Sequence, residues 1–475
     1  MVVNRFNCST LTMRKRVASR SGLFVPRKCL KRNRMSSREE EEKDRISELP
    51  DDILVHILSY MNCKEAARTS ALSSRWKEMW MHTPTLDFDV MGDYMKLPSD
   101  FALIPGEATK YVDCVNRVLK LHKAKESITE FKVRFDIRKC HQGYIDGWVK
   151  FACSQQRLEK LDFSFLDARY YLHNEPETSV FPNPLTLSGG GFRSLKELCF
   201  KSINVNDDVL AYFVGNCQLL ERLVVHYSHH LEHLQVTGPN LKLKHLELVW
   251  CDRLELVRVS DTNIVSIVFE TCGDLQLHNV PSLVRVNFPR MTEPVESVLS
   301  RLSCCAFSQL EMLHLAVSHR LIQKMEMQEF PQLTKVKELL IYTEPQEDFS
   351  LIGLTSLLRA SPNLQTFVLE LSWFKPDRTR REWKEALESP LEHLKEVLVY
   401  GYHGCASEVE LLAYIFRNST ALEKLTIDPQ EKRDMPVPEY PHKMEELQAA
   451  KRVAKHYAET QLTEIAPEHV NLFIL

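Results

Sequence analysis

The sequence predicts an α/β protein in which a small helical module precedes a long, curved solenoid with a parallel sheet. Three observations support this class. An apolar unit of the form L-x-x-L-x-[LVIF] recurs along most of the chain, helical stretches lie between several of its copies, and 475 residues are too many for one ordinary globular core. Glycine occurs only 14 times, which disfavours Gly-rich phosphate loops and nucleotide-binding folds.

The chain begins with a basic leader. Its first 37 residues contain ten Lys or Arg and no Asp or Glu, and an acidic run follows at Glu39–Glu42. We interpret residues 1–43 as a disordered leader, basic and then acidic. Met35 offers a second start, so residues 1–34 could be absent from the working protein. A nuclear signal, a nucleic-acid-binding arm and an organelle transit peptide stay open as alternatives.

Residues 44–88 have the pattern of a compact three-helix module. Leu49–Asp52 opens the first helix, because proline fits a first helical turn and aspartates complement the helix dipole. Asn62, three residues before Glu65, predicts the cap of the second helix, and the third carries Trp76. So short a unit rarely buries enough surface to be stable alone. Its surplus of apolar residues therefore predicts either a partner or packing on the rest of the chain.

The apolar unit occurs twelve times, at steps of 19 to 37 residues. Its second and third positions are two residues apart, so they point the same way from a short strand. Each unit buries little alone, so neighbouring units must stack on a shared core. The middle copies, from Leu243 to Phe288, have short linkers, and we expect these linkers to lack helices. The units are Ile128/Phe131/Val133, Leu158/Leu161/Phe163, Leu195/Leu198/Phe200, Leu220/Leu223/Val225, Leu243/Leu246/Leu248, Ile264/Ile267/Phe269, Leu283/Val286/Phe288, Leu310/Leu313/Leu315, Val336/Leu339/Ile341, Leu364/Phe367/Leu369, Leu394/Val397/Val399 and Leu422/Leu425/Ile427.

Helical stretches precede some of these units. Apolar residues recur at helical spacing within Asp208–Cys217, Leu354–Leu358 and Val409–Phe416. Alternating helices and strands give a curved solenoid with its parallel sheet on the concave side. Cys251 and Cys272 each follow a predicted strand by three residues, and we interpret both as structural thiols that line turns.

The helical module resembles an F-box in the order and spacing of thirteen residues. Met61 stands where a final leucine is usual, and Ser74 where a basic residue is common. The matching residues are Leu49-Pro50, Ile53-Leu54, Ile57-Leu58, Arg68-Thr69-Ser70, Leu72-Ser73 and Arg75-Trp76. The resemblance implies that the module binds the Skp-type adaptor of Skp–cullin–F-box ubiquitin ligases. The interface that it implies is formed or supported by Leu49, Pro50, Ile53, Leu54, Ile57, Leu58 and Trp76.

The rest of the chain resembles two further families. The twelve units are similar to leucine-rich repeats, whose period is ~20–29 residues. The segment from Ser389 through Gly401 and Gly404 to Leu425 resembles the FBD domain that ends many plant F-box/LRR proteins. We therefore divide the chain into the leader (1–43), an F-box (44–88), a leucine-rich repeat array (89–384) and an FBD-like segment (385–475).

These resemblances imply a non-catalytic adaptor, the substrate receptor of a ubiquitin ligase. The F-box would bind the Skp-type adaptor and through it a cullin, and the repeats would bind an unknown protein target. A leucine-rich scaffold outside any ligase and a receptor that depends on a small ligand stay open as alternatives. Thirteen scattered cysteines without a CxxC pair favour a reducing compartment. We expect the protein in the cytoplasm, the nucleus or both.

The sequence predicts no catalytic, cofactor-binding or metal site. His229 and His233 have a spacing that helical zinc ligands use, but no cysteine or carboxylate set completes the site. We therefore predict that they lie in a surface turn with His226 and His230. Ser188–Phe192 lacks the Lys-Ser/Thr of a phosphate-binding loop and is predicted to be an ordinary loop.

The net charge and the hydropathy of the chain limit which further kinds of partner are expected. The net charge of -3 argues against nucleic acid, and the chain lacks an apolar run of about 18 residues, which argues against a transmembrane helix. The aromatic-basic cluster Trp373–Arg381 is predicted to be a loop on the surface of the array. A role of this cluster in binding an acidic partner or a nucleic acid is the alternative.

Overall fold

The computed structural model places most of the chain beyond the leader. The leader lies outside the described residues, and so do Ser188–Gly190, Cys272 and residues 374–381 of the aromatic-basic cluster. The described residues are 46, 48–89, 104–123, 127–165, 178–183, 191–271, 273–289, 293–303, 309–326, 328–345, 349–373, 388–432 and 441–475.

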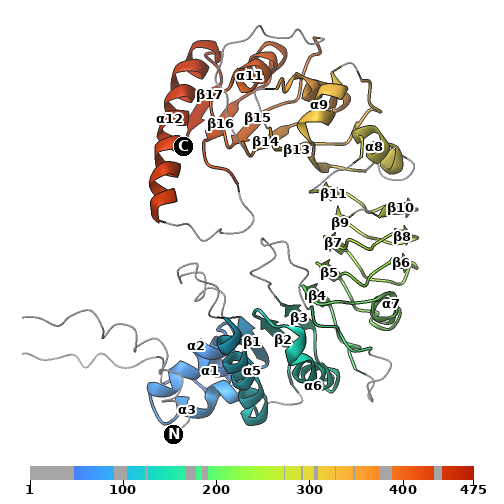
Figure 1. Cartoon of the computed structure of the whole chain (residues 1–475), viewed down its shortest axis with the longest axis vertical. Coiled ribbons are helices and arrows are strands. Elements are labelled where there is room, and N and C mark those ends of the chain that lie inside the picture. The colour runs from blue at the N-terminus through green and yellow to red at the C-terminus, as the bar shows by residue number, and fades with distance from the viewer. Residues whose placement is uncertain are drawn as a thin grey trace, which may run out of the picture.

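Strands line the inner side of a curved arc, and helices cover much of its outer side (Figure 1). Within the described residues, fourteen strands form one continuous sheet in which every pairing is parallel. The predicted α/β solenoid with a parallel sheet is therefore confirmed. In order across the sheet, the strands are β1 Thr85–Asp89, β2 Glu130–Arg134, β3 Lys160–Ser164, β4 Glu197–Lys201, β5 Arg222–His226, β7 His245–Val249, β9 Ser266–Glu270, β11 Arg285–Phe288, β12 Met312–Ala316, β13 Glu338–Thr343, β14 Thr366–Leu371, β15 Glu396–Tyr400, β16 Lys424–Asp428 and β17 Asn471–Ile474.

All twelve predicted units coincide with strands of this sheet, from β2 to β16, and their apolar positions are buried. The sequence missed β1 and β17 because these strands lack the first apolar position of the unit. Thr83 and His469 stand there instead. The sheet also crosses both proposed domain boundaries, since β1 begins within 44–88 and β15 to β17 lie within 385–475.

A second, three-stranded parallel sheet lies on the outer side of the arc at its middle (Figure 1). In the described residues from Leu243 to Phe288 the linkers lack helices, as predicted, but the strands that replace the helices were not predicted. Each strand contributes only two apolar side chains to the core, which is too short a pattern to recognise. Helices α7 and α8 contact the two edges of this sheet. Its strands are β6 His233–Thr237, β8 Leu256–Ser260 and β10 Asp274–His278.

The helices of the array confirm the three predicted helical stretches, which fall in α7, α10 and α11. The other helices were not predicted. None of the helices within the described ranges is both long and apolar enough to cross a membrane. The helices of the array are α5 Ile104–Leu121, α6 Gln142–Cys153, α7 Asp207–Asn216, α8 Val295–Ser303, α9 His319–Met325, α10 Thr355–Ala360, α11 Ala406–Asn418 and α12 Pro441–Ile465.

Aromatic side chains join the first repeats into one core. The ring centroids of Phe131 and Phe163 are 5.8 Å apart, and those of Phe163 and Phe181 are 6.1 Å apart. Phe200 continues the column at 4.7 Å from Phe181, and Phe213 of α7 lies 5.9 Å from Phe200. These edge-to-face and tilted contacts link three strands to the helical layer and hold the concave face in a fixed shape.

Candidate functional site

Three short helices form the N-terminal helical module, as predicted. Asn62 caps the second, because its side-chain oxygen accepts a hydrogen bond of 2.9 Å from the backbone N–H of Glu65. Pro50 takes the cap position of the first helix, one residue before its first turn. The helices are α1 Asp51–Leu58, α2 Cys63–Arg68 and α3 Trp76–Met79, with 3-10 turns at Thr69–Ala71 and Trp80–His82.

Arg75 ties the beginning of α1 to the beginning of α3. Its Nε lies 2.8 Å and its Nη2 lies 2.5 Å from Oδ1 of Asp51, and Nη2 also donates to the carbonyl oxygen of Leu49. The planar guanidinium makes these bonds together, whereas the single ammonium of a lysine offers no such fork. This arginine therefore holds the Leu49–Asp51 segment in place.

The structure separates the seven predicted docking residues into two groups. The first group packs inside the module, with at most 4% of each residue exposed. It consists of Leu54, Leu58 and Trp76. The second group reaches the surface, where Ile53 is 41% exposed. It consists of Leu49, Pro50, Ile53 and Ile57. A partner can touch the second group directly, while the first group shapes the surface from within.

Three more apolar side chains of the module are exposed. Ile46 is 57% exposed, Tyr60 is 79% exposed and Leu72 is 67% exposed. The exposure of Tyr60 and Leu72 could not be predicted from the sequence, because both follow the end of a helix and the helical period no longer sets their direction. Exposed apolar side chains gathered on one small unit are typical of a protein interaction surface.

The other side of the module packs directly on the array. The backbone N–H of Lys123 donates to the carbonyl oxygen of Met81 at 2.8 Å, and that of Thr129 donates to Pro84 at 2.9 Å. The Lys123 side chain also pairs with Glu78. Helix α2 contacts β1. The expected packing of the apolar surplus on the rest of the chain is confirmed on this side of the module, while another side stays exposed.

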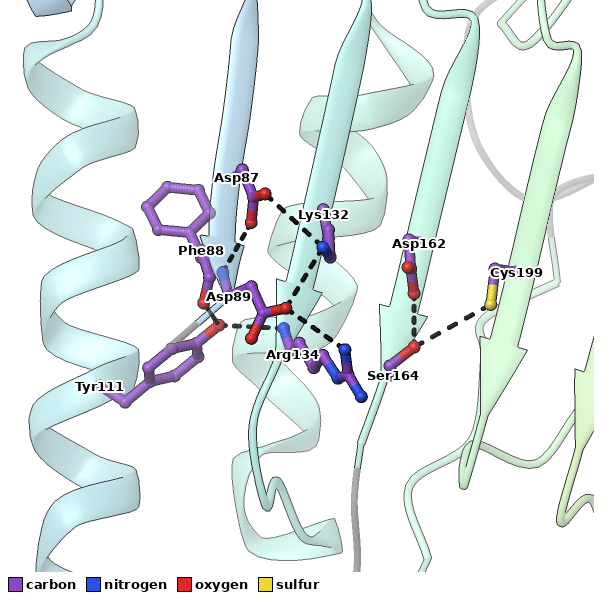
Figure 2. A network of polar contacts seen from close by, with 9 residues as sticks. All are labelled: Asp87, Phe88, Asp89, Tyr111, Lys132, Arg134, Asp162, Ser164 and Cys199. Carbon is purple, nitrogen blue, oxygen red and sulfur yellow. Dashed lines mark hydrogen bonds and ion pairs between the residues drawn. The ribbon is translucent and has the colours of Figure 1, made fainter. Parts of the chain in front are cut away.

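A network of charged side chains covers the concave face at β1 and β2 (Figure 2). Lys132 lies between two carboxylates of β1, with its Nζ 3.5 Å from Asp87 and 3.3 Å from Asp89. Arg134 pairs with Asp89 at 3.3 Å. Because the charges in this network face opposite charges of the same chain, this part of the face is largely self-satisfied.

Tyr111 of α5 connects this network to the helical layer (Figure 2). Its hydroxyl donates to the carbonyl oxygen of Phe88 at 2.9 Å and accepts from the N–H of Arg134 at 3.2 Å. Burial raises the pKa of this phenol well above its usual range. On β3, Asp162 accepts a 2.5 Å hydrogen bond from Ser164, and burial raises the pKa of the Asp162 carboxyl. The Tyr111 hydroxyl thus links β1 to β2, while the Asp162–Ser164 hydrogen bond lies within β3.

Cys199 and Cys251 of the array favour the protonated thiol. Burial raises the pKa of Cys199 and of Cys251 to about 12, whereas nucleophiles and metal ligands need the thiolate. The Sγ of Cys251 lies 3.8 Å from the carbonyl oxygens of Val225 and Val249. The structural, turn-lining role predicted for Cys251 is confirmed.

The four neighbouring histidines do not share one turn. The prediction is right for His229 and His230, but His226 ends β5 and His233 begins β6. The sequence missed β6, and with it the change of direction that separates these side chains. His229 instead pairs with Asp252 at 2.8 Å. The described part of the chain contains no group of three or more His, Cys, Asp or Glu that could hold a metal ion.

A buried glutamate organises the C-terminal part of the array. Glu408 of α11 is 1% exposed, and it accepts hydrogen bonds from the backbone N–H groups of His403 at 3.0 Å and Cys405 at 2.7 Å. The indole N–H of Trp373 also donates to it at 3.0 Å. The surface position predicted for Trp373 is therefore wrong, since this residue is buried and serves the core. Burial raises the pKa of Glu408 to about 7.

Glu408 should make stability depend on pH. Because the folded chain holds this proton more tightly than the unfolded chain does, the stabilisation is complete below about pH 4.5 and is lost as the pH rises through about 7. The loss is of the order of 3 kcal/mol at most. Thermal unfolding of Glu408→Gln, compared with the native chain from pH 5 to pH 8, should lack this part of the pH dependence. The Glu459→Gln variant, which changes an exposed glutamate, should keep the pH dependence of the native chain. If the melting temperature of Glu408→Gln depended on pH as it does in the native chain, the assignment would be contradicted.

Two family models match the chain. The model described as "At1g61320/AtMIF1, LRR domain" matches residues 118–475, and the F-box domain model matches residues 46–85. The first match covers most of the chain, including the segment that resembles an FBD domain. The second coincides with the three helices and the surface described above.

Curated proteins of Arabidopsis thaliana are similar along the chain. A protein named for an F-box, At1g49610, is 33% identical over 215 residues, which are 43% of this chain and 50% of that relative. The F-box/LRR-repeat protein At2g42720 is 25% identical over 69% of this chain and 78% of its own length. The F-box/FBD/LRR-repeat protein At3g26920 is 25% identical over 86% of this chain and 95% of its own length.

Proposed function

Because this chain belongs to the leucine-rich repeat family of At1g61320/AtMIF1 and carries an F-box at its N-terminal end, we propose that it is the substrate receptor of a Skp–cullin–F-box ubiquitin ligase. The F-box binds the Skp-type adaptor, and through it a cullin, while the array binds a target protein. The receptor breaks and forms no bonds itself. It keeps a lysine of the target near the charged conjugating enzyme, which raises their effective concentration.

The exposed apolar surface of the helical module is the observation that carries this proposal. Ile46, Ile53, Tyr60 and Leu72 are each more than 40% exposed on a unit of about forty residues. Water-exposed apolar area of this density is unfavourable, and burying it against a partner gains about 25 cal/mol per Å². We propose that Leu49, Pro50, Ile53 and Ile57 touch the adaptor and that Leu54, Leu58 and Trp76 support them from inside.

The close packing of the module on the array supports the receptor role. The last turn of the module runs through Thr83 and Pro84 straight into β1, and backbone hydrogen bonds join the two parts on both sides of this connection. A target held on the array would therefore keep a fixed distance and direction from the adaptor. Such a fixed geometry favours transfer to particular lysines of the target. A receptor of this kind works in the cytoplasm, the nucleus or both.

Co-purification with a Skp-type adaptor tests the proposal. The native chain should form a stoichiometric complex, and the double variant Leu49→Ala/Pro50→Ala should form little or none. The circular dichroism spectrum of the variant should match that of the native chain. A folded native chain that binds no adaptor would contradict the ligase role and leave a free-standing interaction scaffold.

A further inference from the structure

A row of mostly apolar side chains lies on the concave face of the C-terminal strands. The pairing registers place Leu340 of β13 beside Val368 of β14, and Val368 beside Leu398 of β15. Thr426 and Phe473 continue the row on β16 and β17. We call Leu340, Val368, Leu398, Thr426 and Phe473 the apolar row. With neighbouring strands about 4.8 Å apart, the row is about 19 Å long, enough for about six residues of an extended peptide.

The apolar row is not part of the core. Its side chains alternate along each strand with those that fill the core, such as Leu339 and Ile341, which are fully buried. Val368 is buried, with 8% of the residue exposed, Leu340 and Leu398 are half-buried, and Phe473 is 49% exposed. Outward positions of a solvated sheet are normally polar. Leu340, Val368 and Leu398 depart from this rule, since three neighbouring strands carry an aliphatic residue at the same outward position.

Carboxylates flank the row on both sides. Glu338 and Glu396 lie on one side of it, and Glu370 and Asp428 lie on the other, at outward positions of the same strands. Each of the four has a partner within the chain: His314 for Glu338, Lys424 for Glu396, Lys432 for Glu370 and Lys451 for Asp428. The strands β1 to β3 differ, since Asp87, Lys132 and Asp162 occupy the corresponding row there.

Two lysines of the chain show which chemistry these positions accept. Lys432 lies 3.0 Å from Glu370 and 5.2 Å from the ring centroid of Tyr400, and its own side chain is 51% exposed. Lys424 lies 2.7 Å from Glu396 and 5.6 Å from the ring centroid of Phe473. Both sites combine a carboxylate with an aromatic face, an arrangement that binds an ammonium or a guanidinium.

We propose that the apolar row and its carboxylates bind a target segment that combines aliphatic side chains with Lys or Arg. The aliphatic side chains would lie along the row, and the basic ones would reach the flanking carboxylates, in part by displacing exposed lysines of the chain itself. This inference rests on the proposed function only in calling the bound segment a ligase target. The binding chemistry belongs to the array alone.

Selection from a random peptide library displayed on phage tests this surface. The purified full-length chain serves as bait, and one enriched peptide is synthesised for binding measurements by fluorescence polarisation. Enriched peptides should carry both aliphatic and basic residues. Leu398→Asp and Glu370→Lys should each weaken binding of that peptide by about tenfold or more, because an uncompensated charge enters the contact. The matched variant Val268→Asp, at an outward half-buried position of β9, should change it by less than about twofold.

The outcomes separate this inference from the ligase role. Acidic or charge-free peptides, equal enrichment on Leu398→Asp, or an equal loss in Val268→Asp would overturn it. The same protein preparations are assayed for adaptor binding. Peptide binding without adaptor binding would support the proposed peptide-binding surface and contradict the ligase role. Adaptor binding without selectively enriched peptides would support the ligase role and contradict the peptide-binding surface.

Discussion

Replacing Ile53 with aspartate should weaken binding of a Skp-type adaptor by about 100-fold or more, without unfolding the chain. Ile53 is 41% exposed on α1, so a carboxylate there remains hydrated in the free protein. In a complex the same carboxylate would enter an apolar contact without a partner, which typically costs at least about 3 kcal/mol. The affinity for a purified adaptor can be measured by isothermal titration calorimetry.

Two matched variants make the Ile53 result specific. Val453→Asp changes an apolar side chain with a similar exposure, 44%, on the distant helix α12, and it should leave adaptor binding unchanged. Leu54→Ala removes a fully buried side chain of the module and should lower its stability by about 2–5 kcal/mol. Native-like affinity of Ile53→Asp would exclude this surface of α1 from the interface.

Gly401→Ala should destabilise the C-terminal part of the array by about 3–5 kcal/mol. Gly401 follows β15 with φ of +70°, in the left-handed region that side chains disfavour. A Cβ there would lie 1.9 Å from the carbonyl oxygen of Leu371, which belongs to the neighbouring strand β14. Since backbone atoms cannot rotate away, the two strands would have to shift, and the 2.8 Å hydrogen bond from Gly401 to Asp428 would be strained.

Urea unfolding followed by circular dichroism measures this loss. Gly147→Ala provides the matched control, because this glycine lies inside α6 and a Cβ there would meet nothing within 4 Å. The control should be as stable as the native chain or gain about 1 kcal/mol, as alanine favours a helix over glycine. Equal unfolding midpoints for Gly401→Ala and the native chain would show that the strands accommodate the added carbon.

The sequence predicted the parts of the fold that repeat. Each unit, such as Leu158/Leu161/Phe163, encodes its strand locally, because side chains two residues apart face the same way and an apolar residue a turn earlier fills the layer beneath. This pattern predicted twelve strands and the parallel sheet. It could not predict β6, β8 and β10, since two apolar residues with polar neighbours also occur in loops.

The F-box pattern likewise predicted three helices and a set of seven residues for its interface. Helical spacing alone cannot divide this set, because Ile53 and Leu54 are neighbours on the same helix and both are aliphatic. Their difference in exposure, 41% against 0%, comes from the way α3 packs on α1. Arg75 contributes to that packing from 24 positions further along the chain.

By itself, the sequence determined which residues of the twelve units fill the core, because burial of apolar side chains at a fixed period is a local property of the chain. Only the tertiary structure decided what the concave face presents. Leu340, Val368 and Leu398 are nearly thirty residues apart in sequence, with linkers of unequal length between them. They form one row because parallel pairing brings these strands into register, and that register depends on the stacking of all the repeats.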